Sequence, residues 1–497
     1  MRPDAMDDED HALVTVDGHW STGSTFLVPD SLVRAALRQA GAVAHDRIAC
    51  LPSPQFNSHR LRLSGTRRMT TRHTRAALAI LALLTQPLAS QQNDARVTTA
   101  IARVVPAVIE LRHQIHRNPE LGNRETETAA LVAKHLRSLG MEVRTGVAHT
   151  GVIGVLKGGR PGGIVAVRAD MDALPVTEDT PLPFKSTKRT TYLGQEVGIA
   201  HACGHDIHVA VQLGVASALA SMKDQLKGTV IFIFQPAEEG PPPGEKGGAK
   251  LMLEEGAFDS PRPSAVFGLH AWADMEVGIV AAAPGPMLAA AEGFDAVIRG
   301  KQAHGALPHL SSDPIVMAAH AVTMLQTIRS RSMNSMEPGV VTVGIFRGGE
   351  RRNIIPAEVA LQGTIRTFAM STQEMVERRM HEIFKGVTEA NGGTYTLSFD
   401  RAYPLTTNDS ALYRRMHPTL VRALGAKKVV RSTPTTAGED FSYFANEVPG
   451  FFYFLGTRKQ GGSSGGHHTP TFLADDGAIA VGVRAMTMLV LDYLAGG

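Results

Sequence analysis

Residues 228–240 read GTVIFIFQPAEEG, and this stretch decides the fold. Its run of Val, Ile and Phe is typical of a strand that is buried on both faces of a parallel sheet. A helical pattern precedes it at 205–224, HDIHVAVQLGVASALASMKD, and a shorter one follows at 247–256. Further apolar runs lie at 162–176, GGIVAVRADMDALPV, and at 265–272, AVFGLHAW. Because strands and helices alternate, we expect an α/β fold with a central, mostly parallel sheet and helices on both faces.

The order of elements changes near Met287. From there to residues 394–400, TYTLSFD, the patterns run strand, helix, strand, strand, helix, strand, which is the order of a ferredoxin-like sandwich. After Tyr403 the first pattern resumes. We therefore predict a large domain formed by residues 96–288 and 402–497, with a ferredoxin-like α+β domain, 289–401, inserted into it.

The N-terminal part carries a targeting signal in an internal position. Arg72 and Arg75 follow Met69, the apolar run Ala76 to Leu84 comes next, and small residues follow near Ser90. This pattern is typical of a secretory signal peptide, with a buried helix as the alternative. We interpret residues 69–90 as the signal peptide and residues 1–68, which show no periodic pattern, as a mis-assigned N-terminal extension. Export to a periplasm or to the outside is then expected.

The composition excludes several classes of protein. The net charge of +3 and the lack of a dense Lys/Arg stripe argue against nucleic acid as a partner. Two cysteines cannot form a disulfide framework. We found no apolar run of 18 residues, so we expect no stable membrane insertion.

Residues suited to metal binding follow the predicted strands. In open parallel sheets, ligands bind at the carboxyl ends of the strands. Glu238 and Glu239 follow a buried strand, where two carboxylates are costly without a cation. Cys203 and His205, in HACGHD, are a thiolate and an imidazole that suit a borderline-soft metal. His270 ends a third strand, and GGHHTP follows far downstream at 465–470.

Each of these pieces has a simpler explanation when it is taken alone. A glutamate pair usually marks a solvated turn, and a histidine in an apolar strand is usually a core residue. A cysteine protease would also place Cys203 near a histidine, but that explanation leaves Glu238, Glu239 and His270 without a role. One divalent or dinuclear metal site accounts for all the pieces together.

The motifs also carry a family resemblance. RADMDALPV, HACGHDIHVA, QPAEEG, GLHAW, NIIPAEV, AGEDFSYF and HHTP occur in this order between Val104 and the C-terminus. Together they resemble the aminoacylase and carboxypeptidase family of dinuclear metallopeptidases, peptidase family M20. The match is closest to its amidohydrolase branch of hippurate hydrolases, N-acyl-amino-acid amidohydrolases and auxin–amino-acid conjugate hydrolases. The resemblance implies that the large domain is catalytic and metal-binding, and that the inserted domain is a lid and dimerisation domain.

The resemblance also implies roles for single residues. It makes Cys203 the ligand that bridges two divalent ions of zinc, manganese, cobalt or nickel. The other implied ligands are His205, Glu239, His270 and His468, the last chosen over His467 because it stands two residues before Pro470. Glu238 resembles the general base, and Asp170 an acid beside the site, while His201 and His208 are left as structural.

The inserted domain is expected to contribute to the substrate site. His304 occupies the position of a histidine that stabilises the developing oxyanion, often across a dimer. Asn353 and Arg366 lie where the family grips the carboxylate of the substrate. The expected function is that of a metal-dependent amidohydrolase that cleaves small N-acyl amino acids, with a homodimer formed through the inserted domain. The alternatives are a dipeptidase or carboxypeptidase on the same scaffold and a non-catalytic metal-binding relative, which would have no need of Glu238.

Overall fold

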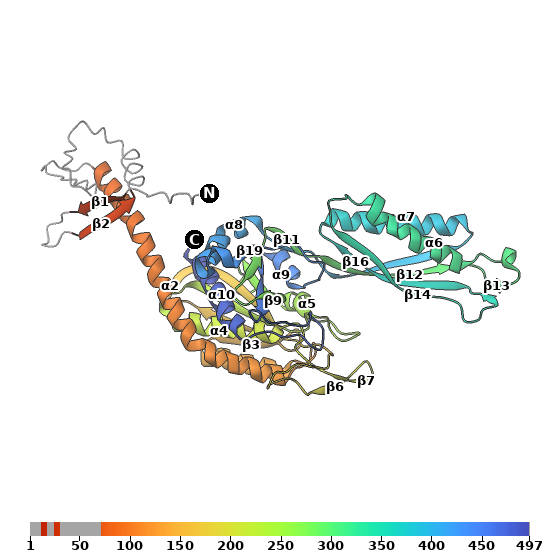
Figure 1. Ribbon diagram of the computed structural model, residues 1–497, viewed down its shortest axis with the longest axis horizontal. Coiled ribbons are helices and arrows are strands. Elements are labelled where there is room, and N and C mark those ends of the chain that lie inside the picture. The colour runs from red at the N-terminus through yellow and green to blue at the C-terminus, as the bar shows by residue number, and fades with distance from the viewer. Residues whose placement is uncertain (1–10, 17–23, 30–70, 497) are drawn as a thin grey trace, which may run out of the picture. The chain divides into compact units, whose positions relative to one another are not determined.

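The computed structural model describes residues 11–16, 24–29 and 71–496 (Figure 1). The chain divides into two compact units, Met1–Ala95 and Arg96–Gly497. In the first unit, β1 (His11–Val16) and β2 (Ser24–Pro29) pair in antiparallel fashion. No regular element was expected here, because two six-residue runs are too short to show a convincing period. The other residues of the predicted extension lie outside the described part.

The helix α2 spans Thr71–Arg117. It includes most of the predicted signal segment, 69–90, and continues into the large domain as far as Arg117. The helix continues through Pro106, although proline is usually found in the first turn of a helix. The role of residues 69–90 as a signal peptide stays a prediction.

The large domain is built on an eight-stranded sheet in the order β19-β10-β20-β9-β5-β8-β4-β3. The strands β20, β9, β5 and β8 run parallel to their neighbours in this central part, so the predicted mostly parallel sheet is confirmed. The strands β4 and β10 pair antiparallel with β8 and β20. The bounds are β3 (Glu142–Val147), β4 (Gly151–Lys157), β5 (Arg160–Asp170), β8 (Lys227–Gln235), β9 (Val266–Glu276), β10 (Val280–Ala282), β19 (Val429–Arg431) and β20 (Gly450–Arg458).

Helices cover both faces of this sheet. Because side chains alternate along a strand, Val165 and Val167 of β5 join one buried cluster and Ala166 joins the other. The first cluster includes residues of α3 (Thr126–Ser138), α4 (His205–Ser221), α8 (Ser410–Leu424) and α10 (Gly477–Ala495). The second includes residues of α5 (Gly248–Glu254) and α9 (Phe441–Glu447).

Helix α10 is long and apolar enough to cross a membrane by length and composition, a feature that the sequence analysis missed. It is the single such helix in the described part of the chain. However, 61% of its apolar window is buried inside the fold, where the helix packs against α4 and α8. Such burial is typical of a core helix in an α/β domain.

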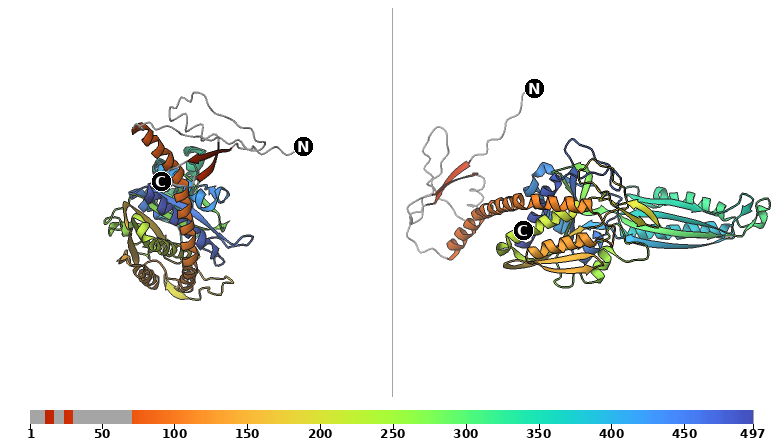
Figure 2. Two further views of the ribbon diagram at one scale, coloured as in Figure 1. Left: turned by 90° about the vertical axis from the view of Figure 1, so that its left-hand side faces the viewer. Right: turned by 90° about the horizontal axis from the view of Figure 1, so that it is seen from below.

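The inserted domain contains a four-stranded antiparallel sheet in the order β14-β16-β12-β17. In chain order its elements are β12 (Ala290–Arg299), α6 (Pro314–Thr327), β14 (Gly339–Arg347), β16 (Glu358–Thr367), α7 (Met370–Ala390) and β17 (Thr394–Tyr403). This is the predicted β-α-β-β-α-β order. Both helices lie along one face of the sheet (Figures 1 and 2).

Two short strands connect the inserted domain to the large one. The strand β11 (Gly285–Leu288) enters the inserted domain and pairs antiparallel with β18 (Thr406–Asn408), which leaves it. The predicted insertion, 289–401, includes the four-stranded sheet except for Ala402 and Tyr403 at the end of β17. These two residues therefore lie at the connection between the domains.

Candidate metal centre

A loop with an unusual backbone places Cys203 at the start of α4. Gly204 precedes the helix with a φ of 95°, a conformation that residues with a side chain rarely adopt. A Cβ atom at Gly204 would lie 2.7 Å from the Cβ of Ala271 in β9. Only glycine allows this close approach, which brings the buried Cys203 next to His270.

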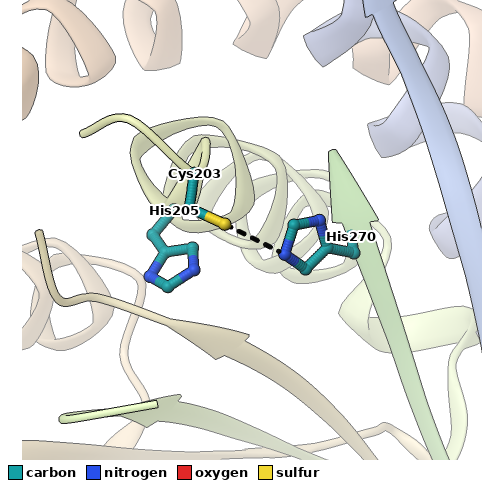
Figure 3. A group of neighbouring side chains, drawn as sticks. All are labelled: Cys203, His205 and His270. Carbon is teal, nitrogen blue, oxygen red and sulfur yellow. Dashed lines mark hydrogen bonds between the residues drawn. The ribbon is translucent and has the colours of Figure 1, made fainter. Parts of the chain in front are cut away.

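Cys203 lies at the centre of the predicted ligands. Its Sγ is 3.4 Å from Nε2 of His270 and 3.3 Å from Nε2 of His468. Figure 3 shows the sulfur between the rings of His205 and His270. The potential ligand atoms of Cys203, His205 and His270 form one compact group, and those of Cys203, Glu239 and His468 form a second. The sulfur is common to both groups, which is what a ligand that bridges two cations requires.

The residues fit a pair of cations in two further respects. Nε2 of His205 is buried and has no hydrogen-bond partner in the described part of the chain. It lies 3.8 Å from Oε2 of Glu238 and 4.0 Å from Oε1 of Glu239, a spacing that leaves room for a shared cation. Burial raises the pKa of the Cys203 thiol, and Glu239 and Glu238 raise it further, so a thiolate here requires a compensating positive charge. Sulfur, imidazole and carboxylate donors together suit a borderline-soft divalent metal.

Neighbouring groups orient these ligands. Nδ1 of His270 lies 2.6 Å from the backbone oxygen of Ala271 and donates to it, so Nε2 is left to face Cys203. Asp172 lies 3.2 Å from Nδ1 of His205 and accepts a 3.0 Å hydrogen bond from the backbone N–H of Glu239. Burial lowers the pKa of His205, but Asp170 and Asp172 outweigh this effect and raise it to about 10.

Asp172 was absent from the predicted site. The signal was present in RADMD, because Asp172 follows Asp170 by two residues and side chains two apart share one side of an extended segment. Asp172 holds one ligand from each of the two groups, so it is the residue that fixes the groups relative to one another.

The two adjacent histidines occupy different environments. His468 has a φ of 63°, and its backbone N–H donates to the oxygen of Ala202. This strained conformation turns the ring toward Cys203 and places its Nε2 2.9 Å from Oε1 of Glu239. His467 packs against Trp272 and Phe472, and burial lowers its pKa to about 4. Its Nδ1 lies 3.7 Å from Sγ of Cys203, and its Nε2 accepts a hydrogen bond from the backbone of Ala273.

Glu238 is buried beside the ligands and its main chain is held firmly. The backbone N–H of Asp440 lies 3.4 Å from Oε1 of Glu238, and the hydroxyl of Tyr403 donates a 2.7 Å hydrogen bond to its backbone oxygen. Burial raises the pKa of Glu238, and the nearby Glu439 and Glu239 raise it further. A carboxylate with a raised pKa is a stronger base. Tyr403 belongs to β17, so the sequence offered no signal that it would reach Glu238.

A buried arginine balances the acids beneath the site. Arg168 donates to Asp170 and to Asp440, in both cases at 2.8 Å. Asp170 also bonds to Nδ1 of His208, and Nε2 of His208 accepts a hydrogen bond from the backbone of Ala271. These contacts fit the positioning role expected of Asp170 and the structural role expected of His208. Both ring nitrogens of His201 are buried and unpaired in the described part of the chain, and burial lowers its pKa to about 4.

The predicted residues of the inserted domain lie elsewhere. His304 ends β13 (Ala303–His304), which pairs with β15 (Ile354–Ile355), and both His304 and Asn353 are exposed. Arg366 pairs with Ala291 at the opposite end of the sheet, near the connection to the large domain. A strand rises about 3.3 Å per residue, so β12 alone separates these ends by roughly 25 Å. Within residues 71–496, the structure therefore does not bring His304 and Arg366 together.

Comparisons with known proteins cover the whole metal centre. Residues 166–492 match the family described as peptidase family M20/M25/M40. Thermostable carboxypeptidase 2 of Saccharolobus solfataricus is 36% identical over 389 residues, covering 78% of this chain and 95% of that protein. N-acetyl-L-cysteine deacetylase of Bacillus subtilis is 38% identical over 375 residues, covering 75% and 84%. A solved Bacillus subtilis structure, described as a dinuclear metal-binding peptidase from the M20 family, has a TM-score of 0.68 at 31% identity and covers 79% of this chain and 99% of that one.

Proposed function

The chain belongs to peptidase family M20/M25/M40 and is a hydrolase of amide bonds, and we propose that it cleaves N-acyl amino acids to a carboxylic acid and an amino acid. The observation that carries this proposal is the position of Cys203, whose sulfur is common to two groups of ligand atoms, with the buried Glu238 beside them. A binding protein would need the ligands but would gain nothing from a second glutamate with a raised pKa.

The residues supply the parts that amide hydrolysis needs. Two divalent cations, held by Cys203, His205, Glu239, His270 and His468, would lower the pKa of water and polarise the carbonyl of the amide. Glu238 accepts the proton of the attacking water and passes it to the leaving nitrogen, a contribution of roughly 10²–10⁴-fold. Its hydrogen bond from Tyr403 keeps the base in place while the proton moves.

Arg366 is suited to hold the carboxylate of the amino acid. It lies at the end of β16 that borders the large domain, where its Nε donates to the backbone oxygen of Thr436. Its Nη1 donates to the backbone oxygen of Ile365. A substrate carboxylate can replace these neutral acceptors with a bidentate pair of charged hydrogen bonds. Exchange of these partners would accompany movement of the inserted domain as a lid.

A homodimer could place a His304 at the metal centre, which His304 does not reach within one chain. The strand β14 forms an edge of the sheet built by the described residues. Exposed apolar side chains gather on β14 and on the neighbouring α6: Val340, Ile345 and Phe346, and Ile315, Val316 and Met324. Edge strands with exposed apolar residues favour pairing with another chain. We propose that the partner is a second copy of this chain. Each copy would then bring its His304 to the metal centre of the other copy, because His304 does not reach the metal centre of its own chain.

Metal reconstitution with a substrate panel tests the proposal. Metal-free protein is loaded separately with zinc, manganese, cobalt or nickel and is then assayed with an N-benzoyl amino acid, an N-acetyl amino acid and a dipeptide. We expect metal-dependent release of the amino acid from the N-acyl substrates. Hydrolysis of the dipeptide alone would favour the dipeptidase alternative, and metal binding without hydrolysis of any substrate would favour the non-catalytic one.

A further inference from the structure

The ligands of the metal centre come from two parts of the chain that the inserted domain separates. The first group, Cys203, His205 and His270, lies entirely before β12. The second group, Cys203, Glu239 and His468, takes His468 from the part after β17. The second group is therefore complete only while the later part of the chain is held against the earlier part.

His468 is less firmly surrounded than the histidines of the first group. Half of its side chain is exposed, whereas His205 and His270 are buried. Both of those rings are oriented by a partner at Nδ1, while Nε2 of His468 faces Cys203 and Glu239, the other ligands of its own group. The position of the His468 ring therefore depends on how its loop, residues 459–476 between β20 and α10, is anchored.

A buried arginine of α2 reaches this His468 loop. Nη1 of Arg112 donates to Oδ1 of Asp476 at 2.6 Å, and its Nη2 donates to the backbone oxygen of Ala474 at 2.8 Å. Its Nε donates to Oδ2 of Asp206, in the first turn of α4, at 2.8 Å. A single guanidinium therefore joins the end of the His468 loop to the helix turn that carries His205.

The end of α2 reaches the His468 loop by a second path. His116, one turn after the arginine, lies 2.9 Å from Oδ2 of Asp206 and 3.1 Å from Oε1 of Glu178. The next residue along the chain, Asp179, donates its backbone N–H to the oxygen of Pro470 at 2.8 Å. The end of α2 thus holds the loop at two points, one beside the ligand histidine and one at the start of α10.

These contacts supply geometry and neither metal ligands nor much stability. In the described part of the chain, the groups of potential ligand atoms include none of the residues Arg112, His116, Glu178, Asp206 and Asp476. A buried ion pair gives little net stability, since the loss of hydration offsets the attraction between the charges. An arginine fork does fix the direction as well as the distance of its partners. The network is therefore suited to hold one segment in register with another.

We propose that Arg112 and Asp476 are positioning residues for the second cation, the one bound by Cys203, Glu239 and His468. They hold the His468 loop against the start of α4, and so they raise the affinity for this cation. The first group keeps its affinity without them, because its ligands precede β12 and its histidines have their own hydrogen-bond partners. The proposal rests on the two cations proposed above and adds the residues that keep the second one bound.

Asp476→Ala tests the proposal, because it frees the His468 loop and leaves the bond between Arg112 and Asp206 in place. The side chain of Asp476 makes no capping hydrogen bond to α10, so the helix itself loses little. The matched control is Asp492→Ala near the other end of the same helix. Its side chain is 25% exposed, against 33% for Asp476, and it accepts hydrogen bonds from Thr419 and Arg422.

The measurement is equilibrium dialysis of the metal-free protein against a series of cobalt(II) concentrations, with thermal unfolding of the metal-free samples alongside. The wild type should bind two ions per chain. In Asp476→Ala one ion should bind roughly tenfold more weakly, while the affinity for the other should not change. His468→Ala, which removes the ligand itself, shows which binding step belongs to the second group. Asp492→Ala should keep both affinities while it loses a similar amount of thermal stability.

A second variant approaches the same contacts from α2. Arg112→Lys keeps the charge, but a lysine cannot hold two carboxylates and a carbonyl in the directions of the arginine fork, so it should show the same selective loss. Two cobalt ions bound with wild-type affinity in both Asp476→Ala and Arg112→Lys would overturn the positioning role and leave the dinuclear centre intact. Equal weakening of both ions, or the same loss in Asp492→Ala, would overturn it as well, since the effect would then be a general loosening. A wild type that binds a single ion would overturn the dinuclear centre and the proposal with it.

Discussion

The hydroxyl of Tyr403 links the end of the inserted domain to Glu238, the proposed base, and Tyr403→Phe removes this link alone. The hydroxyl donates a 2.7 Å hydrogen bond to the backbone oxygen of Glu238, while the ring packs near Ala291 and Gly438. Phenylalanine keeps the ring and leaves the carbonyl of Glu238 without this donor. Loss of one buried hydrogen bond of this kind costs about 1–2 kcal/mol of folding free energy.

The effect on catalysis should exceed the effect on binding. Tyr403 holds the main chain of the base and does not hold a metal ligand, so we expect kcat to fall roughly tenfold, which is about 1.4 kcal/mol of activation free energy. KM and the metal content should stay close to those of the wild type. The assay is steady-state hydrolysis of an N-acyl amino acid, together with thermal unfolding and metal analysis of the same preparations.

Tyr443→Phe is the matched control. Its hydroxyl donates to the backbone oxygen of Ala402, next to Tyr403, at 3.0 Å. The control should lose some stability and keep its kcat. The reasoning is refuted if Tyr403→Phe keeps the wild-type kcat, or if both variants lose kcat equally, since the effect would then be a general loosening of the connection between the domains.

Three further predictions concern other parts of the molecule. Asp172→Asn should weaken metal binding about 10- to 100-fold, as measured by competition with a chelator, because Asp172 orients His205 and the backbone of Glu239; unchanged affinity would contradict this. Burial lowers the pKa of His116, but Asp206 and Glu178 outweigh it and raise the pKa to about 9. Protonated His116 therefore contributes up to about 3 kcal/mol to the free energy of unfolding. This contribution is complete below pH 6.5, the ordinary pKa of histidine, and is lost as the pH rises toward 9. The free energy of unfolding of His116→Gln, measured with denaturant, should therefore depend less on pH than that of the wild type. The proposed export predicts that the secreted protein begins near residue 90, and a secreted protein whose sequenced N-terminus is Met1 would contradict it.

The sequence predicted the large domain well because its signals are local. The apolar run before Glu238 is buried strand β8, and the alternation of strands and helices predicted the mostly parallel sheet that the structure shows. The order of elements in the inserted domain was also predicted, since each of its strands and helices carries its own period. The start of α2 was not predicted, because proline usually breaks or kinks a helix and this helix continues through Pro106.

The site was predictable where a ligand follows a strand or opens a helix. Cys203, His205, Glu239 and His270 are such residues, and the structure brings them together with His468. Asp172 was within reach of the same reasoning. Contacts that depend on how distant segments fold back carry no local pattern, and the hydrogen bond from Tyr403 to the backbone of Glu238 is of this kind.

The central claim is that two cations share Cys203 and that Glu238 is a base and not a ligand. The most direct measurement is metal analysis of Glu238→Gln and Glu239→Gln beside the wild type, with hydrolysis of an N-acyl amino acid assayed on the same samples. Glu238→Gln should retain two metal ions per chain and lose activity by a factor of at least about 10². Glu239→Gln should lose metal as well as activity, because Glu239 contacts His468 within a group that includes Cys203. Loss of metal from Glu238→Gln, with retention in Glu239→Gln, would show that the two roles are reversed.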